Sequence, residues 1–107
     1  MPNIKYVGKN LFIEKLSVAN IAKKEVPPFY IYSENQIKEN YIKFVNTFKK
    51  INPLVCFAAK SNSNLSILRS LGKLGAGTDV VSIGELLKAL KAGIKANKIV
   101  FSGVGKT

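Results

Sequence analysis

One lysine, Lys60, stands directly after a run of six apolar residues, Leu54 to Ala59. If that run is a strand, the alternation of side chains puts Lys60 on the same face as Ala58 and Cys56. An amine held among apolar groups loses hydration when it is protonated, so more of it is neutral. A neutral amine is the nucleophile that forms a Schiff base with an aldehyde. Lys60 is therefore a candidate for covalent chemistry; the alternative is that it merely ends the strand and reaches solvent.

Four further polar residues stand at the ends of the next apolar segments. Asp79 is the sole aspartate and opens an expected strand after the turn 75–78, where its carboxylate could hold an amine or a cofactor group. Aspartate at such a boundary is also commonplace. Glu85 falls in the first turn of the next expected helix, where the helix dipole already favours a negative charge. Ser82 and Ser102 lie at strand ends, where α/β proteins form their ligand crevices, so we expect them to line a pocket.

Regular elements from Ser33 onward must position these side chains. Ser33 and Gln36 have the spacing of a capping box and begin an amphipathic helix of about four turns that is expected to end near residue 52. Strands are expected at 54–59, 79–82 and 99–102, with helices starting near 64 and spanning 83–92. This alternation predicts parallel βαβ crossovers and thus an α/β fold, as an open sheet or part of a barrel.

The first 32 residues follow a different pattern. A short strand is expected at 10–14 and a helical turn or two at 18–24, before Pro27 and Pro28 impose an extended path. The chain therefore divides into an N-terminal segment, 1–32, and a βα part, 33–107. The last expected strand runs almost to residue 107, which would leave a three-stranded parallel sheet with an uncovered edge, so we expect a truncated piece of a larger fold.

Composition excludes several classes of function. The 17 basic residues against 6 acidic ones give a net charge of +11, but all except Arg69 are scattered lysines, without the arginine and aromatic clusters of nucleic-acid sites. The chain lacks histidine and has one cysteine, Cys56, so we expect no metal site and a buried structural thiol. Gly103 and Gly105 do not complete a phosphate loop, because Val100 occupies the position of its first glycine. With neither a signal segment nor a long apolar run, we expect a cytoplasmic protein that does not enter membranes.

Three ordered segments resemble one known family. Residues 57–75 are similar to the pyridoxal-phosphate attachment segment of the ornithine, diaminopimelate and arginine decarboxylases. Residues 75–86 and 99–107 are most similar to the members that act on diaminopimelate, and residues 28–33 resemble the segment that leads into their barrel. The resemblance implies a (β/α)8 barrel of the TIM type, with an alanine-racemase-like architecture, joined to a β domain. It further implies that 1–32 contributes a β-domain strand and that 33–107 supplies about three of the eight barrel strands.

The same resemblance implies roles for the candidate residues. Lys60 would carry pyridoxal 5'-phosphate as a Schiff base, and Asp79 would orient that amine or handle its proton. Glu85 matches the family's acidic position at the helix start, and Ser82 and Ser102 would line the cofactor pocket. The later phosphate-binding loop and the substrate-binding residues of the family lie outside this chain.

The expected function is a lyase of lysine biosynthesis. It would decarboxylate meso-diaminopimelate to L-lysine and CO2, as a homodimer with a small amino-acid substrate, and the piece alone would be inactive. Decarboxylation of ornithine, arginine or carboxynorspermidine stays open, because the lysine motif is shared. A non-catalytic pyridoxal-phosphate carrier on the same barrel is a further alternative, although such carriers lack the β domain. A basic binding module would need a clustered arginine or aromatic face, which the sequence does not show.

Overall fold

The computed structural model describes residues 2–103 and contains two compact units, residues 1–39 and 40–107, whose boundary falls inside one helix. Residues 104–107, the end of the segment 99–107 that carries part of the family resemblance, lie outside the described residues. Within residues 2–103, none of the helices combines the length and the apolar character that crossing a bilayer requires.

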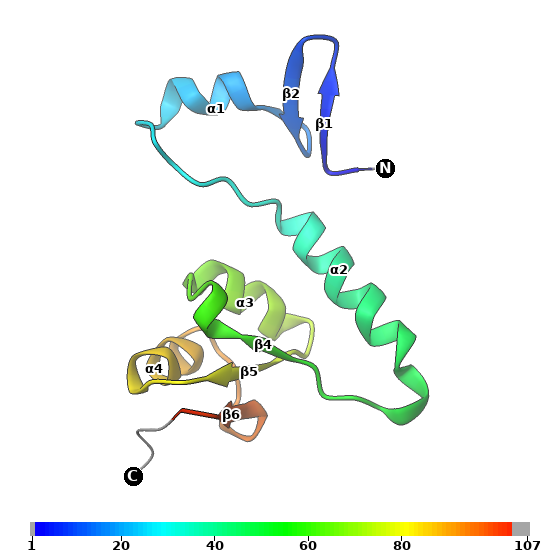
Figure 1. Ribbon diagram of the computed structural model, residues 1–107, viewed down its shortest axis with the longest axis vertical. Coiled ribbons are helices and arrows are strands. Elements are labelled where there is room, and N and C mark those ends of the chain that lie inside the picture. The colour runs from blue at the N-terminus through cyan, green and yellow to red at the C-terminus, as the bar shows by residue number, and fades with distance from the viewer. Residues whose placement is uncertain (1, 104–107) are drawn as a thin grey trace. The chain divides into compact units, whose positions relative to one another are not determined.

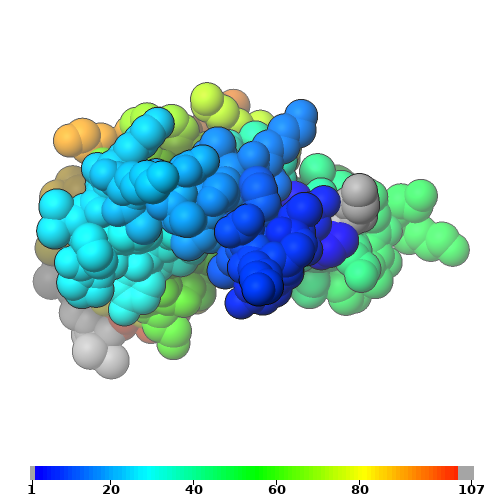
Figure 2. Space-filling view, turned by 90° about the horizontal axis from the view of Figure 1, so that it is seen from above, coloured from blue at the N-terminus to red at the C-terminus, as the bar shows by residue number. Residues whose placement is uncertain are grey.

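The first unit contains a three-stranded antiparallel sheet and a short helix (Figure 1). Its elements are β1 (Ile4–Val7), β2 (Asn10–Ile13), β3 (Leu16–Ser17) and α1 (Val18–Lys24). The β1–β2 hairpin, dark blue in Figure 2, exposes most of its side chains, while Ile13 is buried. The predicted strand at 10–14 and helix at 18–24 are confirmed. β1 and β3 were not predicted, because they are short and mostly exposed and therefore lack a clear hydrophobic pattern.

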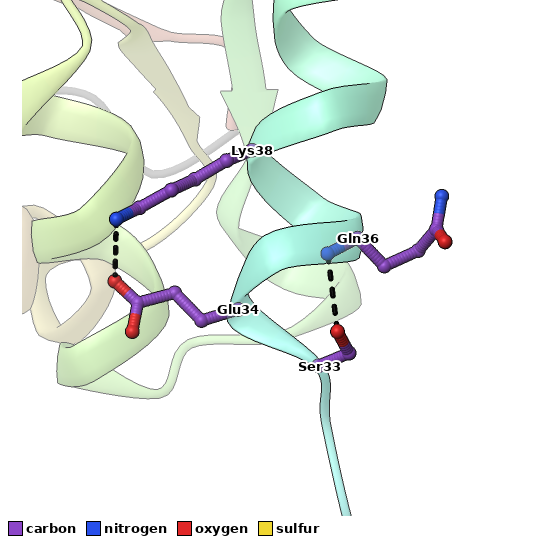
Figure 3. Close-up of polar contacts among 4 residues, drawn as sticks. All are labelled: Ser33, Glu34, Gln36 and Lys38. Atoms are coloured by element: carbon purple, nitrogen blue, oxygen red, sulfur yellow. Dashed lines mark hydrogen bonds and ion pairs between the residues drawn. The ribbon is translucent and has the colours of Figure 1, made fainter. Parts of the chain in front are cut away.

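The helix α2 (Glu34–Thr47) begins as its capping residues predict (Figure 3). The Ser33 hydroxyl accepts a hydrogen bond of 3.1 Å from the backbone N–H of Gln36, and Lys38 forms an ion pair of 3.0 Å with Glu34 one turn earlier. The predicted length of about four turns is confirmed. The end near residue 52 is wrong, because the helix stops at Thr47 and a 3₁₀ turn over residues 49–51 follows.

The second unit is built on a parallel sheet with strand order β4-β5-β6. The elements after α2 are β4 (Cys56–Ala58), α3 (Leu65–Lys73), β5 (Gly77–Val80), α4 (Ile83–Lys91) and β6 (Ile99–Phe101). Ala58 pairs with Asp79, and Asp79 pairs with Val100 across the sheet. Parallel βαβ crossovers, the α/β class and the order of the elements are therefore confirmed.

Both helices of this unit pack on one face of the sheet. The buried cluster draws on α3, α4, β5 and the segments next to them, and consists of Ala59, Leu68, Val80, Ala89, Ala92 and Ile94. Phe57, Ile99 and Phe101 pack against this cluster from the strands. Since side chains alternate along a strand, Ala58, Asp79 and Val100 lie on the opposite face, away from the helices.

Gly77 allows neighbouring segments to pack closely against the start of β5. A Cβ atom at this position would overlap the backbone carbonyl oxygen of Lys98 and would stand 2.8 Å from the Cys56 sulfur. Glycine therefore fits where any other residue would separate the strands. The next residue, Thr78, is fully buried, and its hydroxyl has no hydrogen-bond partner among the described residues.

Candidate functional site

Lys60 lies in a 3₁₀ turn, Ala59–Ser61, that directly follows β4. The Ser61 hydroxyl donates a hydrogen bond of 2.8 Å to the carbonyl of Ala58, and the N–H of Asn62 donates to the carbonyl of Ala59. These bonds fix the turn, and the Lys60 side chain is exposed. The predicted strand at 54–59 is shorter than expected, so the alternation that placed Lys60 on the face of Ala58 stops before it. The prediction that apolar groups surround the Lys60 amine is wrong, because the side chain is exposed. An aldehyde can therefore reach the amine.

Asp79 lies inside β5 and accepts a hydrogen bond from Ser102, the residue that follows β6. The Ser102 hydroxyl donates a hydrogen bond of 2.7 Å to Oδ1 of Asp79. The backbone N–H of Ser102 donates to the carbonyl of Val80, which extends the parallel ladder beyond β6. The expectation that Asp79 opens its strand is wrong, because β5 begins at Gly77 and includes part of the predicted turn. Both Asp79 and Ser102 were candidate site residues in the sequence, but the hydrogen bond between them was not predicted.

Ser82 and Glu85 meet at the start of α4. The Ser82 hydroxyl accepts from the N–H of Glu85 at 3.2 Å, and Glu85 Oε1 accepts from the N–H of Val81 at 3.0 Å. Both side chains thus satisfy backbone donors that the first turn of a helix leaves free. Their roles toward a cofactor remain predictions.

Gly103 fixes the backbone next to Ser102. A Cβ atom at Gly103 would overlap the carbonyl oxygen of Val81 and stand 2.8 Å from the ring of Phe101. The chain after β6 therefore packs tightly against the chain after β5. The carboxyl ends of these two strands carry Asp79 and Ser102, and the turn with Lys60 lies beside β5.

Cys56 and Tyr41 are the described groups whose acidity is clearly perturbed. Burial raises the pKa of the Cys56 thiol above its usual value, and the negative charge of Asp79 raises it further. Burial likewise raises the pKa of Tyr41, with a smaller contribution from Cys56. Both groups therefore stay protonated at neutral pH. Cys56 is a free cysteine of intermediate burial, so the expectation that its thiol is buried is confirmed in part.

The first unit contains a mainly apolar groove of about 310 Å³ that the sequence did not indicate. Its lining residues are Ile13, Glu14, Lys15, Leu16, Ile21, Ile31, Tyr32 and Asn35. None of the predicted site residues lines it. Its lining comes from four separate stretches of the sequence, which is why no local motif could reveal it.

The fold and the site define an α/β unit with an accessible lysine at the carboxyl end of one parallel strand and a carboxylate–hydroxyl pair on the next two strands. Ligand sites of α/β proteins occupy this end of the sheet.

The comparisons with known proteins then identify the family. Residues 34–107 match the family described as "Pyridoxal-dependent decarboxylase, pyridoxal binding domain", and the chain belongs to this family. The matched domain is a pyridoxal-binding domain, which agrees with the predicted cofactor.

Several relatives and solved structures carry the name diaminopimelate decarboxylase. The chain is 48% identical over 107 residues to a diaminopimelate decarboxylase of Pseudomonas fluorescens, covering all of this chain and 26% of the relative. It is 56% identical over 80 residues to that of Helicobacter pylori, covering 75% of this chain and 20% of the relative. A crystal structure of the M. jannaschii diaminopimelate decarboxylase with L-lysine matches with a TM-score of 0.92 at 39% identity, covering 98% of this chain and 26% of that one. The chain therefore spans about a quarter of the length of these relatives.

Proposed function

We propose that this chain supplies the cofactor-binding lysine of a pyridoxal-phosphate-dependent decarboxylase that converts meso-diaminopimelate to L-lysine and CO2. The observation that carries the proposal is the position of Lys60, at the carboxyl end of a parallel strand within the region that matches the pyridoxal-binding family. The substrate is inferred from the relatives, which are named diaminopimelate decarboxylase, and from the L-lysine in one of their structures.

The residues at this end of the sheet suit the cofactor. Lys60 is exposed, so its amine would be available to hold the cofactor through the cofactor's aldehyde group without disturbing the core. A carboxylate, Asp79, lies on the neighbouring strand and can hold a proton of that amine. When bound, pyridoxal phosphate supplies an electron sink for the electron pair that the departing CO2 leaves behind. Ser82, Glu85 and Ser102 would surround the cofactor from the two following strand ends.

The wider architecture follows from the same inference. β4, β5 and β6 would be three of the eight strands of a TIM-type barrel, and residues 1–32 would lead from a β domain into it. The complete enzyme would act as a homodimer. These statements rest on the resemblance to longer relatives, of which this chain covers about a quarter.

Labelling with the cofactor tests the proposal. The chain is incubated with pyridoxal phosphate, reduced with borohydride at timed intervals and digested for mass analysis. We expect the adduct to form at Lys60 ahead of the other lysines. Lys60→Arg keeps the positive charge and should abolish the preferred adduct, while Lys73→Arg, on the exposed end of α3, is the matched control. Labelling without preference for Lys60 would contradict the proposed cofactor site.

Competition by amino acids tests the substrate. A substrate whose amine takes over the aldehyde frees Lys60 and lowers the label that borohydride fixes there. In the full-length enzyme, which also contains the substrate-binding residues, we expect meso-diaminopimelate to protect Lys60 more strongly than ornithine or arginine. The reverse order would favour the related decarboxylases, and equal weak protection by all three would favour a non-catalytic carrier.

A further inference from the structure

The hydrogen bond between Ser102 and Asp79 joins two adjacent strands on the face of the sheet away from α3 and α4. Asp79 pairs with Val100 in the register of β5 and β6. Ser102 lies two residues beyond Val100, so strand alternation returns its side chain to the face that carries Asp79. The contact therefore follows from the register of the sheet.

The donor of this bond has a fixed backbone. The N–H of Ser102 is bound at 3.0 Å to the carbonyl of Val80, and Gly103 packs against the carbonyl of Val81. The backbone that carries the Ser102 hydroxyl is thus held in place by its contacts with Val80 and Val81. A functional side chain is most accurately placed when it is held by a partner on a rigid element.

The hydroxyl contacts one carboxylate oxygen. With a separation of 2.7 Å between Oγ and Oδ1, the bond has the length of a hydroxyl donating to a carboxylate. It limits rotation of the carboxylate about the Cβ–Cγ bond, which is otherwise a soft torsion. The bond engages Oδ1 and does not involve Oδ2, and the Lys60 turn lies beside the same strand.

We propose that Ser102 is a positioning residue, which holds the Asp79 carboxylate in the orientation that accepts a proton from the Lys60 amine. The inference rests on the proposed function and assigns Ser102 a role through Asp79 rather than through direct contact with the cofactor. Lys60 reacts with the aldehyde as a neutral amine, so a correctly placed proton acceptor speeds the attack. Asp79 would take the proton from Nζ as the amine bonds to the aldehyde carbon, and would return it to the carbonyl oxygen, which leaves as water.

A double-mutant cycle on the labelling rate tests this role. In the full chain with saturating pyridoxal phosphate, Ser102→Ala should slow formation of the Lys60 adduct about tenfold, because one hydrogen bond to a charged group is lost. In an Asp79→Asn background, the same substitution should change the rate less than about twofold. Ser102→Thr keeps the hydroxyl at an exposed position and should restore the rate. Ser66→Ala, an exposed hydroxyl on α3, is the matched control and should have no effect.

Three results of the labelling assay would overturn the inference. If Ser102→Ala slowed adduct formation equally in both backgrounds, Ser102 would act independently of Asp79. If it raised the half-saturating concentration of pyridoxal phosphate and left the maximal rate unchanged, Ser102 would be a cofactor ligand. Preferred labelling of Lys60 that Ser102→Ala leaves unaffected would refute this inference alone, whereas labelling that ignores Lys60 would refute the proposed function.

A cofactor-free measurement separates the hydrogen bond from the chemistry. The unfolding equilibrium constants of the two single variants and the double variant, measured in urea, should show a coupling of about fivefold between Ser102 and Asp79. Additive effects would show that the two side chains do not interact in solution and would overturn the inference whatever the labelling rates. NMR spectra of the backbone amides establish that each variant is folded.

Discussion

Replacing Gly77 by alanine tests the close approach of strands at the start of β5. The new methyl group would overlap the Lys98 carbonyl oxygen and stand 2.8 Å from the Cys56 sulfur. The thiol can rotate, but the carbonyl belongs to the backbone that leads into β6. Relieving the overlap requires a backbone shift of roughly 1 Å, in a sheet whose hydrogen bonds set a strand spacing of about 4.8 Å. We expect a loss of about 3 kcal/mol in the free energy of unfolding, typical of severe overpacking.

Urea denaturation measures this loss. With a slope of about 1.5 kcal/mol per molar urea for a chain of this size, the midpoint should fall by about 2 M. Amide resonances of β5 and α3 should follow the transition, so that it reports on the second unit. Gly84→Ala is the control, since its nearest neighbour is the Ser82 hydroxyl at 3.8 Å and its position in α4 favours alanine by about 0.5–1 kcal/mol.

A second substitution identifies which atom opposes the new methyl group. Adding Cys56→Ala to Gly77→Ala removes the sulfur but leaves the Lys98 carbonyl, so we expect little recovery. Full recovery would assign the clash to the thiol. A midpoint for Gly77→Ala within about 0.3 M of the unsubstituted chain would refute the reasoning, because the methyl group would then be accommodated without cost.

Three further predictions concern the second unit. Leu68→Ala removes a fully buried core side chain and should lower the free energy of unfolding by about 2–5 kcal/mol, measured in urea. Ser82→Ala removes the cap of α4 and should cost about 1 kcal/mol in the same assay, while Ser82→Asp should retain most of the stability. Burial raises the pKa of Cys56 above the usual 9.0, so the unfolded chain loses the thiol proton first, and the midpoint of thermal unfolding should fall as pH rises above about 9. Cys56→Ala should reduce that fall; an unchanged profile would contradict the assignment to this thiol.

Much of the second unit could be predicted because its signals are local. Caps such as Ser33 and Asn64, together with the apolar repeats after them, place α2 and α3 close to their observed starts. The strand ends were less accurate, since an apolar run such as 54–59 continues into the turn that carries Lys60. Alanine packs equally well in a strand or a 3₁₀ turn, so the sequence does not mark the change.

The candidate site, like the fold, could be predicted only in part. The candidate residues at 60, 79, 82, 85 and 102 lie at or after the carboxyl ends of the three strands, as expected, because strand ends can be located from sequence. The contacts among them could not be predicted. Whether Ser102 bonds to Asp79 depends on the register of β5 against β6, and Ser82 pairs with Glu85 through the geometry of a helix start. Register is a tertiary property that a single sequence does not encode locally.

The excess of lysines has a consequence for how fast an anionic ligand arrives. With 17 basic residues and 6 acidic ones, at least 11 cationic side chains have no acidic residue of this chain to neutralise them. Such a field raises the encounter rate with a phosphate ester and leaves the chemical step unchanged. The association of pyridoxal phosphate with this chain should therefore slow as ionic strength rises, since the Debye length falls from about 30 Å at 0.01 M to about 10 Å at 0.1 M salt.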